Sequence, residues 1–109
     1  MSERREVPRY VAEFPGQVSQ PPGGPSLRVK VANLSIMGCC LAGAKSIKVH
    51  EVCELKIEWE GKEFHAQADV IWKSGEGEVG LRFREVDEAS QALVRKICAN
   101  LLLEPPGSH

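Results

Sequence analysis

The chain has 109 residues and a mass of 12.0 kDa, which is the size of one compact domain. Hydrophobic residues make up 42% of it and charged residues 27%, and these ordinary globular proportions exclude a disordered chain. The formal net charge is −1, so the chain lacks the broad basic surface of a protein that coats nucleic acid.

The sequence contains no membrane span, no secretory signal and no metal-binding motif. No run of about 18 apolar residues could form a transmembrane helix, and the first residues contain no apolar core of a secretory signal. We therefore expect a cytoplasmic protein without membrane insertion. The spacing of the cysteines does not match a zinc site, so we expect no metal. We expect four reduced thiols, most of them packed as small hydrophobic groups: Cys39, Cys40, Cys53 and Cys98.

Apolar and polar residues alternate with a period of two over most of the chain, which is typical of half-buried antiparallel strands. A first strand is expected over about residues 10–19, where the Pro15-Gly16 pair marks an edge or a bulge. The turn at residues 21–25 leads to a second strand from Leu27, and a short third strand follows over 38–43. Three more strands are expected over 53–59, 64–72 and 79–84, with hairpin turns at 60–62 and 75–77.

The period changes to that of a helix near the end of the chain. Asp87 is suited to cap its start, and the residues Pro105, Pro106 and Gly107 are expected to stop it. One apolar stripe would cover an open end or face of the sheet, and it comprises Leu93, Val94, Ile97, Cys98, Leu101 and Leu102. Six strands and one helix indicate a mainly β domain, either a small antiparallel barrel or a sandwich.

Catalytic constellations are not found in the sequence. The three histidines are scattered, and His65 falls on a polar strand face, where a solvated histidine is expected. No serine has the context of a nucleophile elbow, and the glycine-rich stretch at 22–25 has no phosphate-loop lysine. We therefore expect a binding protein rather than an enzyme.

Two short segments carry recognition chemistry. Arg4, Arg5 and Arg9 place three planar cations just before the first strand, where they could grip phosphate or stack on bases, although a frayed terminus explains them equally well. Asn33, Ser35 and Gly38 place short polar groups and a glycine between two strands, although a plain turn would also use them.

Taken together, these segments resemble one family. The motif Arg5-x-x-x-Arg9, followed by Asn33-x-Ser35-x-x-Gly38, is similar to the paired signature of PilZ domains, which are bacterial receptors for cyclic di-GMP. Val70-Ile71-Trp72 and Gly80-Leu81-Arg82-Phe83 match further strands of the family. The resemblance implies a six-stranded antiparallel barrel with a C-terminal helix, formed by a single domain over 1–109. Its core would span about 4–103, with a flexible arm over 1–9 and a disordered tail over 104–109.

The resemblance also implies roles for single residues. Arg5 and Arg9 would wrap cyclic di-GMP, Asn33 and Ser35 would hydrogen-bond a guanine and the nearby ribose-phosphate, and Gly38 would shape the turn. Asn33 replaces the aspartate of many family members, which offers guanine two acceptor oxygens where an amide offers one. Arg4, directly before the motif, tends in the family to accompany an intercalated dimer of the ligand, which predicts two ligands per chain.

Two further residues have open roles. Trp72 shares a strand face with Phe64 and Val70, so we favour a place in the core, but some family members stack the equivalent ring on a guanine. Arg82 is interpreted as a solvated strand residue rather than a ligand contact.

The predicted function is that of a receptor with no output domain and no cofactor besides its ligand. Ligand binding would change the conformation of the arm and signal to an unidentified effector protein. The alternative is a ligand-independent interaction module of the same fold. A barrel that binds single-stranded nucleic acid ranks last, because only 6% of the residues are aromatic and the net charge is −1.

Overall fold

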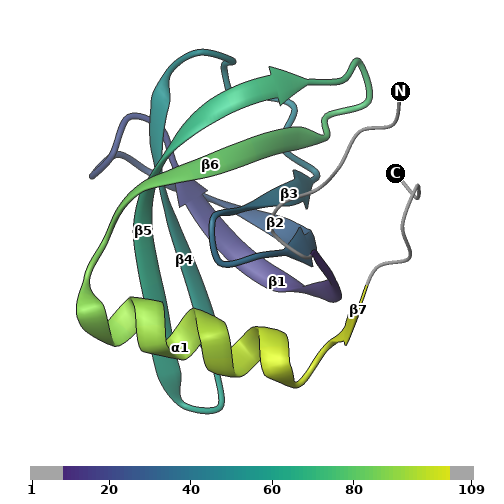
Figure 1. Ribbon diagram of the computed structural model, residues 1–109. Helices are drawn as coiled ribbons and strands as arrows, with labels where there is room; N and C mark the ends of the chain where they lie inside the picture. Colours follow the sequence, from purple (N-terminus) through teal and green to yellow (C-terminus); the bar gives the residue numbers. More distant parts are fainter. Residues whose placement is uncertain (1–8, 104–109) are drawn as a thin grey trace, which may run out of the picture.

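The computed structural model describes residues 9–103 (Figure 1). Six main strands pair antiparallel in the order β2-β3-β6-β5-β4-β1, and β1 also pairs with β2, which closes the sheet into a barrel. The predicted mainly β barrel with a C-terminal helix is therefore confirmed. The elements are β1 (Tyr10–Ser19), β2 (Ser26–Leu34), β3 (Gly38–Ala42), β4 (Val52–Trp59), β5 (Lys62–Lys73), β6 (Val79–Val86), α1 (Glu88–Ala99) and β7 (Leu102–Leu103).

The alternation of the sequence fills the barrel with side chains from every main strand. Fully buried members include Val18, Val31, Leu41, Leu55 and Phe64, one from each of five strands. Each removes apolar surface from water, which stabilises the fold by roughly 1.5–3 kcal/mol for a large aliphatic or aromatic side chain. The interior is therefore a packed core, and a ligand site must lie on the outside.

The first strand departs from the prediction in one detail. Its register shifts between Val11 and Phe14, and Glu13 adopts a positive φ of 57° there. Pro15 and Gly16 instead pair regularly with Lys30 and Val29 of β2. The predicted bulge at Pro15-Gly16 is thus wrong, because the extra residue is accommodated just before it. The alternative, an edge, is confirmed on the other side of β1, where β4 pairs only with Gln17, Val18 and Ser19.

A second irregularity changes the face of Trp72. The pairing of β5 with β6 runs from Val70 opposite Leu81 directly to Trp72 opposite Gly80, so Ile71 is an extra residue. A bulge of this kind shifts the alternation by one position. Ile71 and Trp72 are consequently 46% and 40% exposed, and the prediction that Trp72 lies in the core is wrong.

The helix α1 lies across one end of the barrel (Figure 1) and buries Leu93, Val94, Ile97 and Cys98. Asp87 caps it as predicted, since its carboxylate accepts a hydrogen bond from the Ser90 backbone at 2.8 Å. The helix ends at Ala99, before the predicted proline stop, because Asn100 leaves the helical conformation. The two residues of β7 then pair with the start of β1. The stripe was thus predicted one turn too long, although Leu101 still packs against the core.

Candidate functional site

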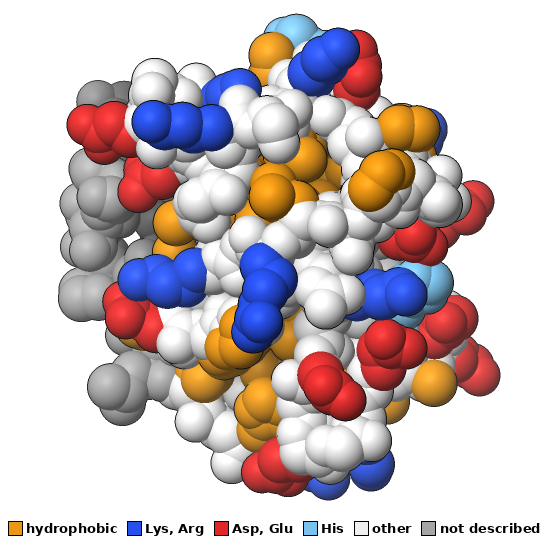
Figure 2. All heavy atoms as spheres, turned by 180° about the vertical axis from the view of Figure 1, so that it is seen from behind, with side chains coloured by type: hydrophobic (Ala, Val, Ile, Leu, Met, Phe, Trp, Pro, Cys, Tyr) orange, Lys and Arg blue, Asp and Glu red, His pale blue; other side chains and the backbone are white. Residues whose placement is uncertain are grey.

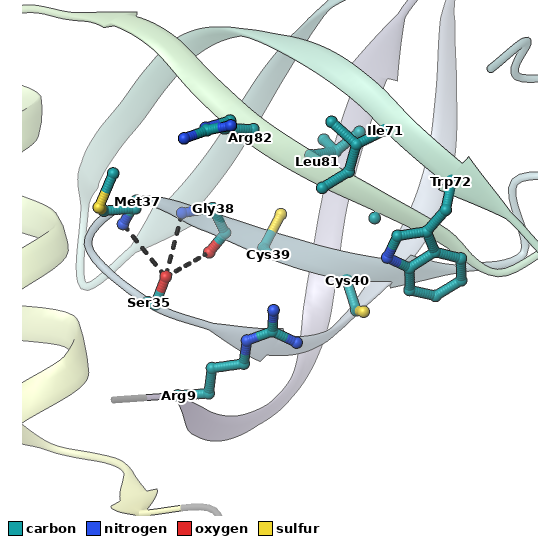
Figure 3. Close-up of a pocket in the computed structure, with 11 residues that line it drawn as sticks. Arg9, Ser35, Met37, Gly38, Cys39, Cys40, Ile71, Trp72, Leu81 and Arg82 are labelled. Atoms are coloured by element: carbon teal, nitrogen blue, oxygen red, sulfur yellow. Dashed lines mark hydrogen bonds between the residues drawn. The ribbon is translucent and has the colours of Figure 1, made fainter. Parts of the chain in front are cut away.

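A cleft of about 300 Å³ opens on the outside of the barrel, where β3, the end of β5 and β6 meet the residue before β1 (Figure 3). It combines backbone from the turn between β2 and β3 with side chains from both flanking strands. The residues that line it are Arg9, Ser35, Met37, Gly38, Cys39, Cys40, Ile71, Trp72, Gly80, Leu81 and Arg82.

Two guanidinium groups give the cleft a positive charge. Arg9 lies on one side of the β2–β3 turn and Arg82 on the other, in β6 (Figure 3). Neither makes an ion pair or a side-chain hydrogen bond within residues 9–103, whereas Arg84 lies 3.7 Å from Asp69. No carboxylate lines the cleft among the described residues. Such cations bind phosphate through planar, charge-assisted hydrogen bonds.

Trp72 supplies an aromatic wall. Its indole ring lies on Gly80, so closely that a side-chain carbon at position 80 would overlap the ring. The ring and the apolar side chain of Ile71 therefore form one side of the cleft, opposite Arg9. An exposed indole held in this way can stack on a nucleobase.

The turn between β2 and β3 is built by Ser35. Its hydroxyl donates to the Gly38 carbonyl oxygen and accepts from the backbone N–H groups of Met37 and Gly38, each at 3.1 Å. These bonds use the donor and both acceptor positions of the hydroxyl, and the side chain is 95% buried, since only 5% of it is exposed. Ser35 thus fixes the floor of the cleft rather than offering an unsatisfied group to it.

Gly38 is required because the backbone of a neighbouring strand leaves no room for a side chain. It pairs with Arg82 across β3 and β6, and a Cβ at this position would overlap the Leu81 carbonyl oxygen. The missing side chain of Gly38 thus allows strand β6 to approach its backbone closely. This contact brings Arg82 and the turn to the same cleft.

Asn33 belongs to β2 and pairs with Cys40 of β3, a residue that lines the cleft. Its own side chain does not line the cleft, but its Oδ1 is buried and has no hydrogen-bond partner in the described part of the chain. A buried acceptor without a partner is costly. Arg4 and Arg5, which the sequence also assigned to the site, lie outside the described residues.

Sequence reasoning missed several residues of the cleft. Met37, Ile71, Cys40 and Arg82 line it, although only Arg82 had been considered, and then as a solvated residue. Arg82 could have been found from the register of β3 and β6, because Arg82 pairs there with Gly38 of the recognised motif. Register between distant strands is not visible in a local pattern.

Three of the four cysteines are buried, and one of these, Cys39, lines the cleft together with the half-buried Cys40. Burial raises the pKa of Cys53 to about 11 and that of Cys98 to about 11, from a usual value of 9.0. Burial also raises the pKa of Cys39, with smaller contributions from the neighbouring Cys40 and Cys53 that the Arg9 guanidinium opposes. These three thiols are therefore protonated core groups, as the sequence predicted.

Outside the cleft, three kinds of functional feature matter in residues 9–103: a metal site, a membrane-spanning helix and a basic surface track. Residues 9–103 hold no cluster of His, Cys, Asp and Glu that could bind a metal ion, and no helix in that range is long and apolar enough to cross a membrane. His65 is partly exposed as expected and lies 2.8 Å from a Glu54 carboxylate oxygen. On the face opposite that of Figure 1, basic and acidic side chains are interspersed (Figure 2), so this face offers no continuous basic track.

Solved structures of known domains share this fold. The chain superimposes on the Bacillus subtilis inhibitor of motility, MotI or DgrA, with a TM-score of 0.71, at 19% identity over 90% of this chain and 51% of that one. The PilZ domain with c-di-GMP of YcgR from Escherichia coli gives 0.72, at 18% identity over 91% and 92%. The Borreliella burgdorferi PlzA protein in complex with c-di-GMP gives 0.65, at 11% identity over 89% and 41%.

The family is shown by a sequence model rather than by these structures. The chain spans about half the length of MotI and less than half that of PlzA, but nearly all of the isolated YcgR domain. No curated protein matches the chain significantly in sequence. The model of one family, the PilZ domain, matches residues 3–100. The chain therefore belongs to the PilZ domain family.

Proposed function

We propose that the chain is a receptor for cyclic di-GMP and that the ligand binds in the cleft between Arg9, Trp72 and Arg82. One observation carries this proposal: two guanidinium groups that make no ion pair among the described residues line the same cleft of about 300 Å³ as an exposed indole ring. A cyclic dinucleotide has two phosphate charges and two flat bases. The two cations and the aromatic wall are complementary to these features.

The comparisons support the choice of ligand. Two of the structures with this fold, those of YcgR and PlzA, contain c-di-GMP. A nucleotide monophosphate would also fit the chemistry of one arginine and one ring. The two separate cations, on opposite sides of the Ser35 turn, favour a ligand with two phosphates.

The geometry supports a role for each of several residues. Arg9 and Arg82 would bind phosphate or guanine edges, and Trp72 would stack on a base. Ser35 and Gly38 would act by holding the turn, since the Ser35 hydroxyl is already satisfied. The Asn33 side chain, which does not line the cleft, would have to turn toward the ligand before its buried oxygen could accept a hydrogen bond from guanine.

The proposal has three finer parts. Arg4 and Arg5, together with Arg9, would cover an intercalated ligand dimer, which predicts two ligands per chain. Ligand binding would change the conformation of residues 4–9, and a protein partner would read that change. Amide exchange in residues 4–9 should slow when ligand is added, and unchanged exchange would refute the conformational part.

Isothermal titration of cyclic di-GMP tests the binding proposal. We expect binding by the wild type and a loss of at least tenfold in affinity for Arg9→Ala, Arg5→Ala and Arg82→Ala. Arg28→Ala is the matched control, because Arg28 is an exposed cation of β2 that does not line the cleft. A stoichiometry near two supports the dimer and a value near one excludes it. A folded wild type that binds no cyclic di-GMP would instead support the ligand-independent interaction module.

A further inference from the structure

A second, apolar groove lies beside the ligand cleft, between the β2–β3 turn, β6 and helix α1. It has a volume of about 200 Å³, and Phe83, Val86 and Val94 form part of its lining. Ile36 and Met37 line it from the tip of the turn. Met37 also lines the ligand cleft, so the two hollows lie on either side of a single turn.

The fold does not need the exposed side chains of this turn. Ser35 and Gly38 make the hydrogen bonds and strand contact that define it. Ile36 and Met37 contribute instead large apolar side chains that are 44% and 48% exposed. With Ile71 and Trp72 in the cleft, they are the large hydrophobic residues that the described chain leaves in water. Adjacent exposed apolar groups next to a hollow are typical of an interaction surface.

The charges beside the groove have one sign. Its charged lining residues are Arg84 and Arg95, and no acidic side chain lines it among residues 9–103. Arg84 lies 3.7 Å from Asp69, whereas Arg95 makes no ion pair in the described part of the chain. The chain as a whole has a net charge of −1, so this local excess of positive charge is not a general property of the surface.

We propose that this groove binds an acidic amphipathic segment of a partner protein. The apolar side chains of the segment would enter the groove between Ile36 and Val86, and its carboxylates would pair with Arg95 and Arg84. The narrow hollow suits inserted side chains, whereas a lipid surface would need a flat or protruding apolar face. The inference rests on the proposed function only in that the receptor is expected to have a protein partner.

Hydrogen bonds join the three elements that line the groove. The Phe83 backbone N–H donates to the Met37 carbonyl oxygen at 2.8 Å, and the Gln91 side chain donates to the Val86 carbonyl oxygen at 2.9 Å. The turn, β6 and α1 are therefore held together at the groove. A partner segment would contact all three elements at once.

Selection from a phage library of random 16-residue peptides on the full chain tests the proposal. We expect the selected peptides to be rich in Asp and Glu interleaved with large apolar residues. Binding of the corresponding synthetic peptides should weaken at least tenfold in Arg95→Glu and in Ile36→Ser. Arg28→Glu, an equal charge reversal at an exposed residue of β2, should leave binding unchanged.

Each other outcome contradicts the proposal. Neutral or basic peptides, peptides indifferent to Arg95→Glu, or no selected peptides would all exclude an acidic partner segment. A dimer that dissociates in Ile36→Ser, measured by sedimentation, would show that a second copy fills the groove instead. Titration of cyclic di-GMP into the wild type and into Ile36→Ser separates this inference from the proposed function. Ile36 does not line the ligand cleft, so both proteins should bind the ligand equally even if neither binds the peptides.

Discussion

The indole ring of Trp72 lies on its cross-strand partner Gly80, in space that any side chain at position 80 would occupy. The bulge at Ile71 turns the ring to the outside of the barrel, and the missing side chain of Gly80 lets it lie flat against β6. A tryptophan and a glycine in two different strands thus form one wall of the proposed ligand site.

The first prediction concerns Gly80→Ala. The new methyl group should displace the Trp72 ring and weaken cyclic di-GMP binding about tenfold, since a base–aromatic stack contributes roughly 1–3 kcal/mol. Titration measures the affinity, and the fluorescence emission of Trp72 in a Trp59→Phe background shows whether the ring has moved. Trp72→Phe should retain part of the stacking. Wild-type affinity in both Gly80→Ala and Trp72→Ala would show that the ring does not contact the ligand.

Gly38→Ala should destabilise the fold itself. Its Cβ would overlap the Leu81 carbonyl oxygen, so β3 and β6 must separate. We expect a loss of about 1–3 kcal/mol in the free energy of unfolding, as for other overpacked sites. Gly75→Ala is the matched control, because nothing lies within 4 Å of a Cβ there. Equal urea midpoints for the two variants would contradict this account of Gly38.

Ser35→Ala should act through the turn. It leaves the backbone N–H groups of Met37 and Gly38 without their acceptor, and unsatisfied groups of this kind cost about 1–3 kcal/mol. Urea denaturation measures the loss, and Ser26→Ala, at the exposed end of β2, is the control. If Ser35→Ala kept full stability and lost only ligand affinity, the hydroxyl would contact the ligand directly.

Stability should fall in alkaline solution because of the core thiols. The folded pKa of Cys53 and of Cys98 is raised to about 11 from 9.0, so the unfolded chain loses these protons first. Their contribution is fully present below about pH 9 and is lost as the pH rises through 11. Urea denaturation between pH 8 and 11 measures this slope. The double variant Cys53→Ala, Cys98→Ala should show a shallower slope, and an identical one would contradict the assignment.

Local patterns in the sequence were sufficient for most of the fold. The period of two located four of the six main strands, the first and third were expected beside them, and Asp87 located the start of the helix. The hairpin at Glu60 and Gly61 was also evident, where both residues adopt a positive φ, of 51° and 78°. Each of these signals comes from neighbouring residues, and tertiary structure did not override them.

The candidate site was less predictable because it depends on relations between strands. One extra residue at Ile71 reversed the face of Trp72, which no alternating pattern reveals. Arg82 reaches the cleft through its register with Gly38, and the Ser35 hydroxyl turns inward to its own backbone. The helix also ends at Ala99 rather than at the prolines, because the C-cap residue Asn100 already leaves the helical conformation.

The most direct test is a two-dimensional amide NMR titration of the labelled chain with cyclic di-GMP. The account predicts shifts at Arg9, at residues 35–40 and 80–82, and at the indole N–H of Trp72. The indole N–H of Trp59, at the far end of β4, should not shift. No shifts, or shifts confined to residues outside this cleft, would contradict the proposal that these residues form a cyclic di-GMP site.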